Sequence, residues 1–258
     1  MIQERGKMKE KSIRFWAHRG CSMQYPENSI EAFLQAANMP GVVGVEFDVQ
    51  LTKDGEVVVF HDENVSRVTN GNKGIAEYTL NELKELWIAP DDERQTKIPT
   101  LRETMECLKP YCKEKGFLIN IELKTGTIHY SGIEEKTYDL VREYQMESYI
   151  VYSSFWMESV KKMKELNPAN QTGMLAEFLS DCIERGRYAG VDALHPWIGG
   201  MDCEIPKEMQ GMPVRAWNCE EPFYKDGRVL KERHMEKYAM FGVTDIFTNV
   251  PELYVGVG

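Results

Sequence analysis

The sequence predicts a single (β/α)8 barrel with a small insert after its second strand. The chain has 258 residues, of which 42% are hydrophobic, so it is long enough for one α/β barrel or for two small domains. Short runs typical of strands alternate with amphipathic helical patterns, and this alternation favours a parallel sheet. An Asp-Gly turn accounts for the one strand in excess of eight.

Nine stretches bounded by turn residues have the composition of strands, and stretches with helical periodicity lie between most of them. The predicted strands are residues 14–18, 42–49, 57–61, 117–123, 149–153, 172–175, 191–194, 213–217 and 245–248. The main predicted helices are residues 29–37, 101–112, 134–144, 157–166 and 230–241. Asn28 is predicted to cap the first helix, with Glu31 three residues later in a variant of the capping box.

The second predicted strand turns back on itself at Asp54 and Gly55, because an Asp-Gly pair between two β-type runs is typical of a hairpin. The returning strand is then antiparallel, which leaves eight parallel strands for the barrel. The insert covers about residues 49–100 and is mostly irregular, with one short helix at residues 80–86. We expect no second core in it, and therefore one domain over residues 1–258.

The balance of charges excludes some classes of partner. Lys and Arg number 31 against 41 Asp and Glu, which gives a formal net charge of −10. A basic field for nucleic acid or an anionic membrane is absent, so an anionic substrate needs a local group of cations. No apolar run approaches the ~18 residues of a membrane span. The N-terminal residues also lack an apolar signal segment, so we expect a cytoplasmic protein without stable membrane association.

Three acidic residues are candidates for a metal site. Glu46 and Asp48 lie two residues apart in a predicted strand and share one face of it, and Glu122 lies in the next parallel strand. Oxygen ligands alone favour Mg²⁺, Ca²⁺ or Mn²⁺ over Zn²⁺. The alternative is a buried ion pair, for example with Lys124, which shares the face of Glu122.

Two histidines lie at strand ends, where α/β-barrel enzymes keep their active sites. His18 ends the first predicted strand, and His61 ends the returning strand of the hairpin. Two imidazoles can act as an acid and a base in phosphoryl chemistry, whereas each alone could be a structural histidine. Arg19 and Lys124 would supply the local cations for a phosphate, or would pair with the carboxylates instead.

The order of these residues resembles that of the glycerophosphodiester phosphodiesterase family. The resemblance begins with His18-Arg19-Gly20, is densest over residues 15–124 and extends to the last predicted strand. A His-Arg-Gly triplet alone would be weak evidence, whereas an ordered series of motifs is strong. The other matching motifs are Pro26-Glu27-Asn28-Ser29, Glu46-Phe47-Asp48, Leu51-Thr52-Lys53-Asp54-Gly55, residues 58–62, Arg67-Val68-Thr69, Gly71, Ile121-Glu122-Leu123-Lys124, Ser153-Ser154-Phe155, Leu194-His195-Pro196 and residues 214–217.

The resemblance implies a TIM barrel and a metal-dependent hydrolase that cleaves glycerophosphodiesters to sn-glycerol 3-phosphate and an alcohol. Glycerophosphocholine and glycerophosphoethanolamine are the expected substrates. One divalent cation is implied, Mg²⁺ or Ca²⁺ with Mn²⁺ as a third choice. The implied roles are metal ligation by Glu46, Asp48 and Glu122, acid and base catalysis by His18 and His61, and phosphate binding by Arg19 and Lys124.

The resemblance leaves several alternatives open. Which histidine is the acid and which the base does not follow from the sequence. A lysophospholipase D acting on lysophospholipids is the alternative enzyme, and a catalytically silent barrel that binds a phosphodiester is the alternative outside enzymes.

Three more residues match the family pattern near later strand ends. Phe155 and Trp217 are expected to line the glycerol or head-group pocket, and His195 to contact the phosphate or orient a neighbour. The sequence departs from the pattern where the family often has Trp-Thr-Val-Asn and Thr-Asp-x-Pro. It reads Trp217-Asn218-Cys219-Glu220 and Thr248-Asn249-Val250-Pro251 there. We expect both departures to affect the alcohol side of the pocket more than the phosphate chemistry.

Overall fold

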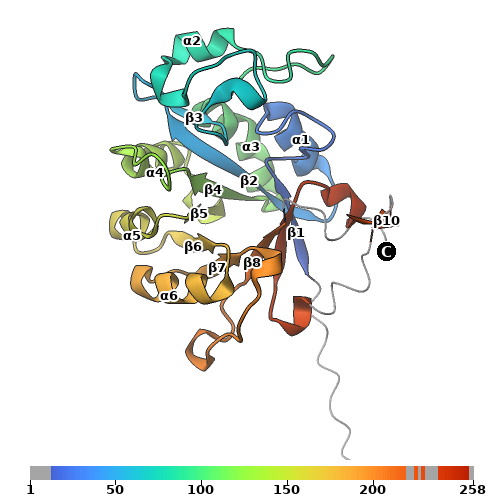
Figure 1. Ribbon diagram of the computed structural model, residues 1–258, viewed down its shortest axis with the longest axis vertical. Coiled ribbons are helices and arrows are strands. Elements are labelled where there is room, and N and C mark those ends of the chain that lie inside the picture. The colour runs from blue at the N-terminus through green and yellow to red at the C-terminus, as the bar shows by residue number, and fades with distance from the viewer. Residues whose placement is uncertain (1–12, 219–223, 226–227, 230–237, 256–258) are drawn as a thin grey trace, which may run out of the picture.

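The protein forms a barrel of eight parallel strands with helices on its outside (Figure 1). The computed structural model describes residues 13–218, 224–225, 228–229 and 238–255. Neighbouring strands follow the order β7-β6-β5-β4-β2-β1-β11-β8, and β3 pairs antiparallel with β2 as the Asp-Gly turn predicts. The strands are β1 (Arg14–His18), β2 (Val42–Leu51), β3 (Val57–Val59), β4 (Leu118–Leu123), β5 (Ile150–Ser154), β6 (Gln171–Ala176), β7 (Ala193–Pro196), β8 (Arg215–Asn218) and β11 (Asp245–Thr248).

The first and last strands of this series, β7 and β8, close the barrel loosely. Between β7 and β8 the pairing consists of two isolated parallel bridges, Leu194 with Val214 and Trp197 with Trp217. Elsewhere in the ring, β1 pairs with both β2 and β11. The barrel is therefore nearly closed, and the predicted fold class is confirmed.

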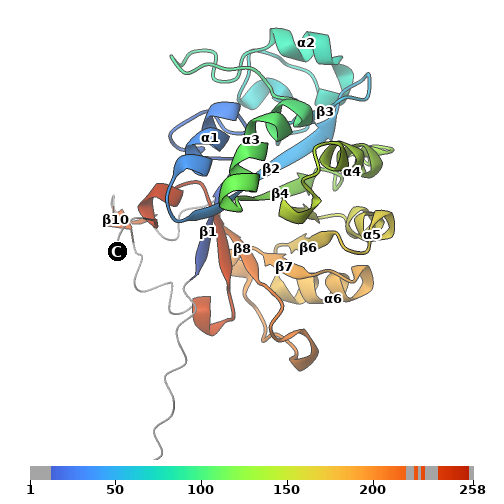
Figure 2. The same cartoon turned by 180° about the vertical axis from the view of Figure 1, so that it is seen from behind.

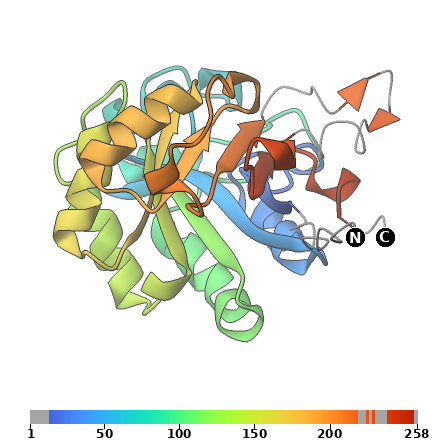
Figure 3. The ribbon, with the colours of Figure 1, turned by 90° about the horizontal axis from the view of Figure 1, so that it is seen from below.

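Helices cover the outside of the barrel, and α1 and α3 lie side by side there (Figure 2). Along the other flank, α4, α5 and α6 follow one another (Figure 3). Within the described ranges the α-helices are α1 (Ile30–Asn38), α2 (Leu80–Glu85), α3 (Leu101–Lys115), α4 (Ile133–Glu143), α5 (Met157–Leu166) and α6 (Leu179–Ala189). Two 3₁₀ turns, Ile198–Gly200 and Lys207–Met209, replace a helix between β7 and β8.

The connection between β8 and β11 is described only in part. A short antiparallel pair, β9 (Tyr224–Lys225) and β10 (Arg228–Val229), lies in it. Most of the helix predicted at residues 230–241 falls on residues 230–237, which lie outside the described residues.

The insert after β2 lies at one end of the molecule, where α2 is drawn above β3 in Figure 1. It has a hydrophobic cluster of its own, so the prediction that it contains no second core was wrong. The apolar residues of this cluster follow no regular period, and the sequence pattern therefore concealed it. Its buried residues are Val58, Phe60, Val65, Ile75, Tyr78, Leu83, Ile88 and Ile98.

The first helix begins one residue later than predicted. Ser29 is its N-cap, and the Ser29 hydroxyl accepts a hydrogen bond from the backbone N–H of Ala32. Asn28 has a φ of 54°, and its side-chain amide donates to Asp48 Oδ2 at 2.9 Å. The predicted cap at Asn28 was wrong because this side chain belongs to the interior of the barrel.

Side chains of complementary size fill the barrel below its mouth. Trp16 is fully buried on the face of β1 that also carries His18, two residues further along. A Cβ on Gly44 of β2 would lie 2.6 Å from the Trp16 ring, so only glycine leaves room for it. The Trp16 indole N–H donates to Asp245 Oδ1 at 2.8 Å, and Arg14 pairs with the same carboxylate. The barrel is thus filled by aromatic and paired polar groups beneath the layer that holds His18.

Candidate active site

A cavity of about 270 Å³ lies at the carboxyl ends of the barrel strands. It collects eight of the ten residues singled out in the sequence: His18, Arg19, Glu46, His61, Glu122, Phe155, His195 and Trp217. Asp48 and Lys124, the other two, contact members of this set, as described below. The cavity is also lined by Asn120, Ser153, Leu175 and Phe247, which the sequence did not identify as cavity residues.

Three buried carboxylates form a cluster beside this cavity. The register of β2 and β4 places Asp48 opposite Glu122, and Glu46 lies on the same face of β2. One oxygen of each carboxylate lies within 4.8 Å of the others. Burial, together with the negative charges of Asp48 and Glu122, raises the pKa of Glu46 well above its ordinary value. The protein alone therefore does not neutralise the cluster.

Asp48 is the carboxylate that stays ionised most readily. Burial by itself would raise its pKa, but the positive charges of His61, Arg19 and Lys124 outweigh burial and lower it. Its Oδ2 accepts from Asn28, whereas its buried Oδ1 has no hydrogen-bond partner among the described residues. A buried carboxylate oxygen without a partner, among three clustered carboxylates, is the donor set that a hard divalent cation prefers. The chain's own residues therefore fit such an ion.

His18 is buried, and its two ring nitrogens face different groups. Nδ1 lies 2.6 Å from the side-chain oxygen of Asn249, so this nitrogen carries the proton that it donates. Nε2 lies 3.7 Å from Glu46 Oε2, on the side of the carboxylate cluster. Burial, and next the positive charge of Arg19, lower the pKa of His18 to about 3. The departure from the family pattern at Asn249 therefore lies against the first histidine, and its expected effect on the alcohol side of the pocket stays a prediction.

His61 lies on the loop that follows β3, and Gln50 holds this loop in place. The Gln50 amide donates to the backbone oxygens of Phe60, His61 and Asp62, at 2.8 to 3.1 Å. The His61 ring donates through Nδ1 to the carboxylate of Asp62 at 2.6 Å. The second histidine is thus fixed by a carboxylate, whereas the first is fixed by a neutral amide.

Arg19 extends from the mouth of the barrel between two carboxylates. Its Nη1 donates to Glu27 Oε1 at 3.0 Å, and its Nε lies 3.7 Å from Asp48 Oδ2. The backbone N–H of Arg19 donates to Glu46 Oε2 at 3.1 Å. Arg19 therefore brings positive charge to the carboxylate cluster with both its side chain and its backbone.

The backbone explains the glycine of the His-Arg-Gly motif. Arg19 has a φ of 55°, a backbone conformation that residues other than glycine seldom adopt. Gly20 follows with a φ of 79°, and a Cβ on it would lie 2.6 Å from the Cβ of Ala32 in α1. Only glycine at this position lets the chain turn tightly between β1 and the first helix.

Lys124 pairs with one of the carboxylates. Its Nζ lies 3.2 Å from Glu122 Oε1, and both side chains are largely buried. Burial alone would lower the pKa of Lys124, but the negative charges of Glu122 and Asp48 raise it. The ion pair proposed from the sequence as an alternative to metal ligation therefore exists, yet it engages one carboxylate of three.

Aromatic rings form the outer wall of the cavity. Phe155 and Trp217 meet edge to face, with ring centroids 6.1 Å apart, and Phe155 is 38% exposed. The Trp217 indole donates to the backbone oxygen of His195 at 3.1 Å. His195 itself is fully buried, and its Nε2 lies 3.5 Å from Nη1 of Arg215. Burial and the charge of Arg215 lower the pKa of His195 well below its ordinary value.

Four residues that hold or line the site were not predicted as site residues. Asn249 and Gln50 orient the two histidines, and Asn120 donates to Ser153 at 2.8 Å inside the cavity. Asn120 lies two residues before Glu122 and shares its face of β4, which only weakly indicates a place in the cavity. The roles of Asn249 and Gln50 depend on contacts across the fold, which local patterns do not contain.

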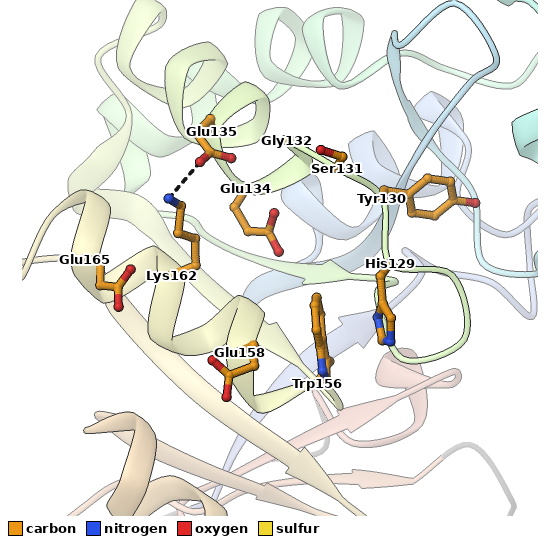
Figure 4. Close-up of a pocket in the computed structure, with 10 residues that line it drawn as sticks. All are labelled: His129, Tyr130, Ser131, Gly132, Glu134, Glu135, Trp156, Glu158, Lys162 and Glu165. Carbon is orange, nitrogen blue, oxygen red and sulfur yellow. Dashed lines mark ion pairs between the residues drawn. The ribbon is translucent and has the colours of Figure 1, made fainter.

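A second cavity of about 320 Å³ lies between α4, α5 and the loop that precedes α4 (Figure 4). His129 stacks on Trp156 there, with ring centroids 3.9 Å apart, and Lys162 pairs with Glu135. None of the ten site residues singled out in the sequence lines it. The carboxylate cluster and the two histidines, each hydrogen-bonded through Nδ1, therefore distinguish the first cavity as the candidate active site.

None of the helices in the described ranges combines the length and the apolar character needed to cross a membrane.

Comparisons with known proteins agree on one family. The glycerophosphoryl diester phosphodiesterase family matches residues 18–253. The chain is 34% identical to a glycerophosphodiester phosphodiesterase of Caldanaerobacter subterraneus subsp. tengcongensis, over 93% of this chain and 96% of that protein. It is 32% identical to a glycerophosphodiester phosphodiesterase of Bacillus altitudinis, over 95% of this chain and 97% of that protein.

Solved structures agree with the fold. A phosphodiesterase of Oleispira antarctica, in complex with the product sn-glycerol-3-phosphate, matches with a TM-score of 0.72 and 26% identity. The match covers 94% of this chain and 96% of that one. Because the family match spans almost the whole chain and the fold agrees with it, the chain belongs to the glycerophosphoryl diester phosphodiesterase family of enzymes.

Proposed function

We propose that this protein is a metal-dependent enzyme that hydrolyses small glycerophosphodiesters, such as glycerophosphocholine and glycerophosphoethanolamine. The products would be sn-glycerol 3-phosphate and the free alcohol. One observation carries the proposal: a single cavity unites a cluster of buried carboxylates with two histidines whose Nδ1 atoms are already hydrogen-bonded. The Oleispira antarctica structure with sn-glycerol-3-phosphate supports the same product. The chain would act as one domain over residues 1–258.

Glu46, Asp48 and Glu122 would hold one divalent cation, either Mg²⁺ or Ca²⁺, with Mn²⁺ as a third choice. When bound, such an ion offsets the charge of the phosphate and polarises its P–O bonds. Arg19 and Lys124 would bind the phosphate oxygens, Arg19 through its planar guanidinium and Lys124 as a point charge. These two cations supply the local positive charge that an anionic substrate needs in a protein of net charge −10.

The partners of the two histidines support an assignment of acid and base. His61 donates its Nδ1 proton to the Asp62 carboxylate, whereas His18 donates to the neutral amide of Asn249. A negative carboxylate offsets the charge of an imidazolium, and a neutral amide does so less. His18 would therefore accept a proton from the nucleophile at Nε2, and His61 would give a proton to the leaving alcohol at Nε2. Water as the nucleophile would give sn-glycerol 3-phosphate directly, whereas attack by the 2-hydroxyl of the glycerol group would give a cyclic phosphate that water then opens.

The remaining cavity residues would select the organic part of the substrate. Phe155 and Trp217 offer an apolar wall for the glycerol carbons or for the head group. His195, with Asn120 and Ser153 on neighbouring strands, would form the polar side of the pocket. The 38% exposure of Phe155 gives the wall an open edge, which leaves room for head groups of different sizes.

The experiment that tests the proposal is an assay of sn-glycerol 3-phosphate release. Glycerophosphocholine, glycerophosphoethanolamine and one lysophospholipid are each offered with Mg²⁺, Ca²⁺, Mn²⁺ or EDTA. We expect release from the two glycerophosphodiesters with a metal, none in EDTA, and none from an Asp48→Asn variant. Choline release from the lysophospholipid without sn-glycerol 3-phosphate would favour a lysophospholipase D instead. No turnover in any combination would favour the catalytically silent barrel.

A further inference from the structure

We infer that Arg67, a residue of the insert, is a positioning residue that holds both Arg19 and His61 in their working places. The inference rests on the proposed function, since it assigns Arg67 a part in that reaction without contact to the substrate. It is carried by a continuous chain of side chains, Arg19–Glu27–Arg67–Asp62–His61.

The guanidinium of Arg67 binds two carboxylates at once. Its Nη1 and Nη2 donate to the two oxygens of Glu27 at 2.9 and 2.6 Å. Its Nε and Nη2 donate to the two oxygens of Asp62, with Nη2 at 3.2 Å. One planar group thus makes two forked contacts, which the point charge of a lysine cannot reproduce.

Each carboxylate passes this restraint on to a residue of the active site. Glu27 Oε1, which Arg67 binds, also accepts from Nη1 of Arg19 at 3.0 Å. Asp62 Oδ1, which Arg67 also binds, accepts the Nδ1 proton of His61 at 2.6 Å. With Asp62 held, its oxygen fixes both the orientation and the tautomer of the His61 ring.

The insert itself anchors Arg67. Arg67 is the last residue of the 3₁₀ turn Val65–Arg67, and Val65 is fully buried in the hydrophobic cluster of the insert. Asn64 is the N-cap of this turn, and its side chain accepts from the backbone N–H of Ser66. The position of the guanidinium therefore depends on the core of the insert, and the insert is connected to both sides of the barrel mouth through one residue.

A mainly structural role for this network is disfavoured by its exposure. The Arg67 side chain is 47% exposed, and ion pairs at such sites add little to the stability of a fold. The loss of Arg67 should therefore appear in catalysis rather than in the melting temperature. Arg102 provides a control of similar exposure, because its side chain is 48% exposed and also makes a forked contact with a carboxylate. That carboxylate, Glu143 on the outer helices, is more exposed than Glu27 and Asp62.

The first test compares Arg67→Met, Arg67→Lys and Arg102→Met in the release of sn-glycerol 3-phosphate from glycerophosphocholine. We expect Arg67→Met to lower kcat/KM on the order of a hundredfold, the cost of a small misplacement of catalytic groups. Arg67→Lys should recover only part of this loss. Arg102→Met should stay within about twofold of the wild type. Activity of Arg67→Met within about twofold of the wild type would overturn the inference.

The second test needs no substrate and reads His61 directly. The protein has five histidines, so the ¹⁵N spectrum of its imidazoles is simple to assign with a His61→Ala variant. In the wild type, His61 should show a protonated Nδ1, and Arg67→Met should shift the ring toward the other tautomer. An unchanged His61 signal in Arg67→Met would contradict the inference. An inactive wild type whose His61 signal still depends on Arg67 would refute the proposed function and leave the positioning role standing.

Discussion

At the scale of single residues, the two histidines of the site differ in what holds them. His18 donates its Nδ1 proton to the amide of Asn249, where the family often has an aspartate, and His61 donates to the carboxylate of Asp62. A carboxylate stabilises a positive ring more than an amide does. This difference, rather than the position of either histidine along the chain, predicts which ring carries the proton to the leaving group.

The roles of the histidines can be separated by changing the leaving group. A glycerophosphodiester of p-nitrophenol releases a phenolate, which needs no proton. On glycerophosphocholine, His18→Ala and His61→Ala should each lower kcat by about 10²- to 10⁴-fold. On the p-nitrophenyl ester, His61→Ala should recover most of its activity, whereas His18→Ala should not. Recovery of His18→Ala instead would reverse the assignment of acid and base.

Several site residues could be named from the sequence, and others could not. Glu46, Asp48 and Glu122 were visible because strand alternation fixes which side chains share a face, and the parallel register brings the two strands together. Asn249 was not assigned to a histidine because it binds His18 across 231 positions of the chain. No local period relates two residues so far apart, and their contact follows only from the closure of the barrel.

At the scale of elements, the strands and helices predicted in the described ranges lie within three residues of their observed bounds, and one helix was missed. β1 and β11 begin and end at the predicted residues, because short apolar runs bounded by turns define them on both sides. α6 was not among the predicted helices. Its pattern contains Gly186, and glycine is a poor helix former. In the structure this position needs glycine, because a Cβ there would lie only 2.8 Å from the Val191 side chain. Close packing of the helix on the chain that enters β7 explains that glycine, and packing is invisible in propensity.

A similar close approach between two strands gives a stability prediction. A Cβ on Gly173 of β6 would lie 2.3 Å from Nε2 of His195 on β7. We expect Gly173→Ala to lower the free energy of unfolding by ~1–3 kcal/mol through overpacking, measured by urea denaturation. Gly126→Ala is the control, since its Cβ would meet only Phe155, at 3.7 Å, and it should be nearly neutral. Equal stability of the two variants would show that the barrel interior yields to accommodate the methyl group.

At the scale of the whole molecule, the carboxylate cluster should make the stability of the fold depend on a cation. The three buried carboxylates repel one another, and this repulsion together with burial keeps the pKa of Glu46 high. An ion that binds only the folded protein stabilises it in proportion to the logarithm of its concentration. The site and the fold are therefore thermodynamically linked.

We expect Mg²⁺, Ca²⁺ or Mn²⁺ to raise the Tm of the protein, and EDTA to reverse the shift. At a free ion concentration of about 100 Kd, the stabilisation should reach ~2.7 kcal/mol. Asp48→Asn, which removes one ligand charge at nearly constant shape, should abolish the shift. A Tm that is insensitive to all three ions in the wild type would count against a metal site at Glu46, Asp48 and Glu122.

The pairing of β1 with β11 has a consequence for the synthesis of the chain. A ribosome makes Asn249 more than two hundred residues after His18, and the Asp245 that binds Arg14 and Trp16 comes equally late. Until then, the nascent chain exposes one side of β1 as an unpaired edge, which invites pairing with other chains. The first histidine likewise lacks the amide that orients it. An incomplete translation product that lacks Asp245 and Asn249 would therefore carry most of the candidate site residues without the contacts that order the first strand and its histidine.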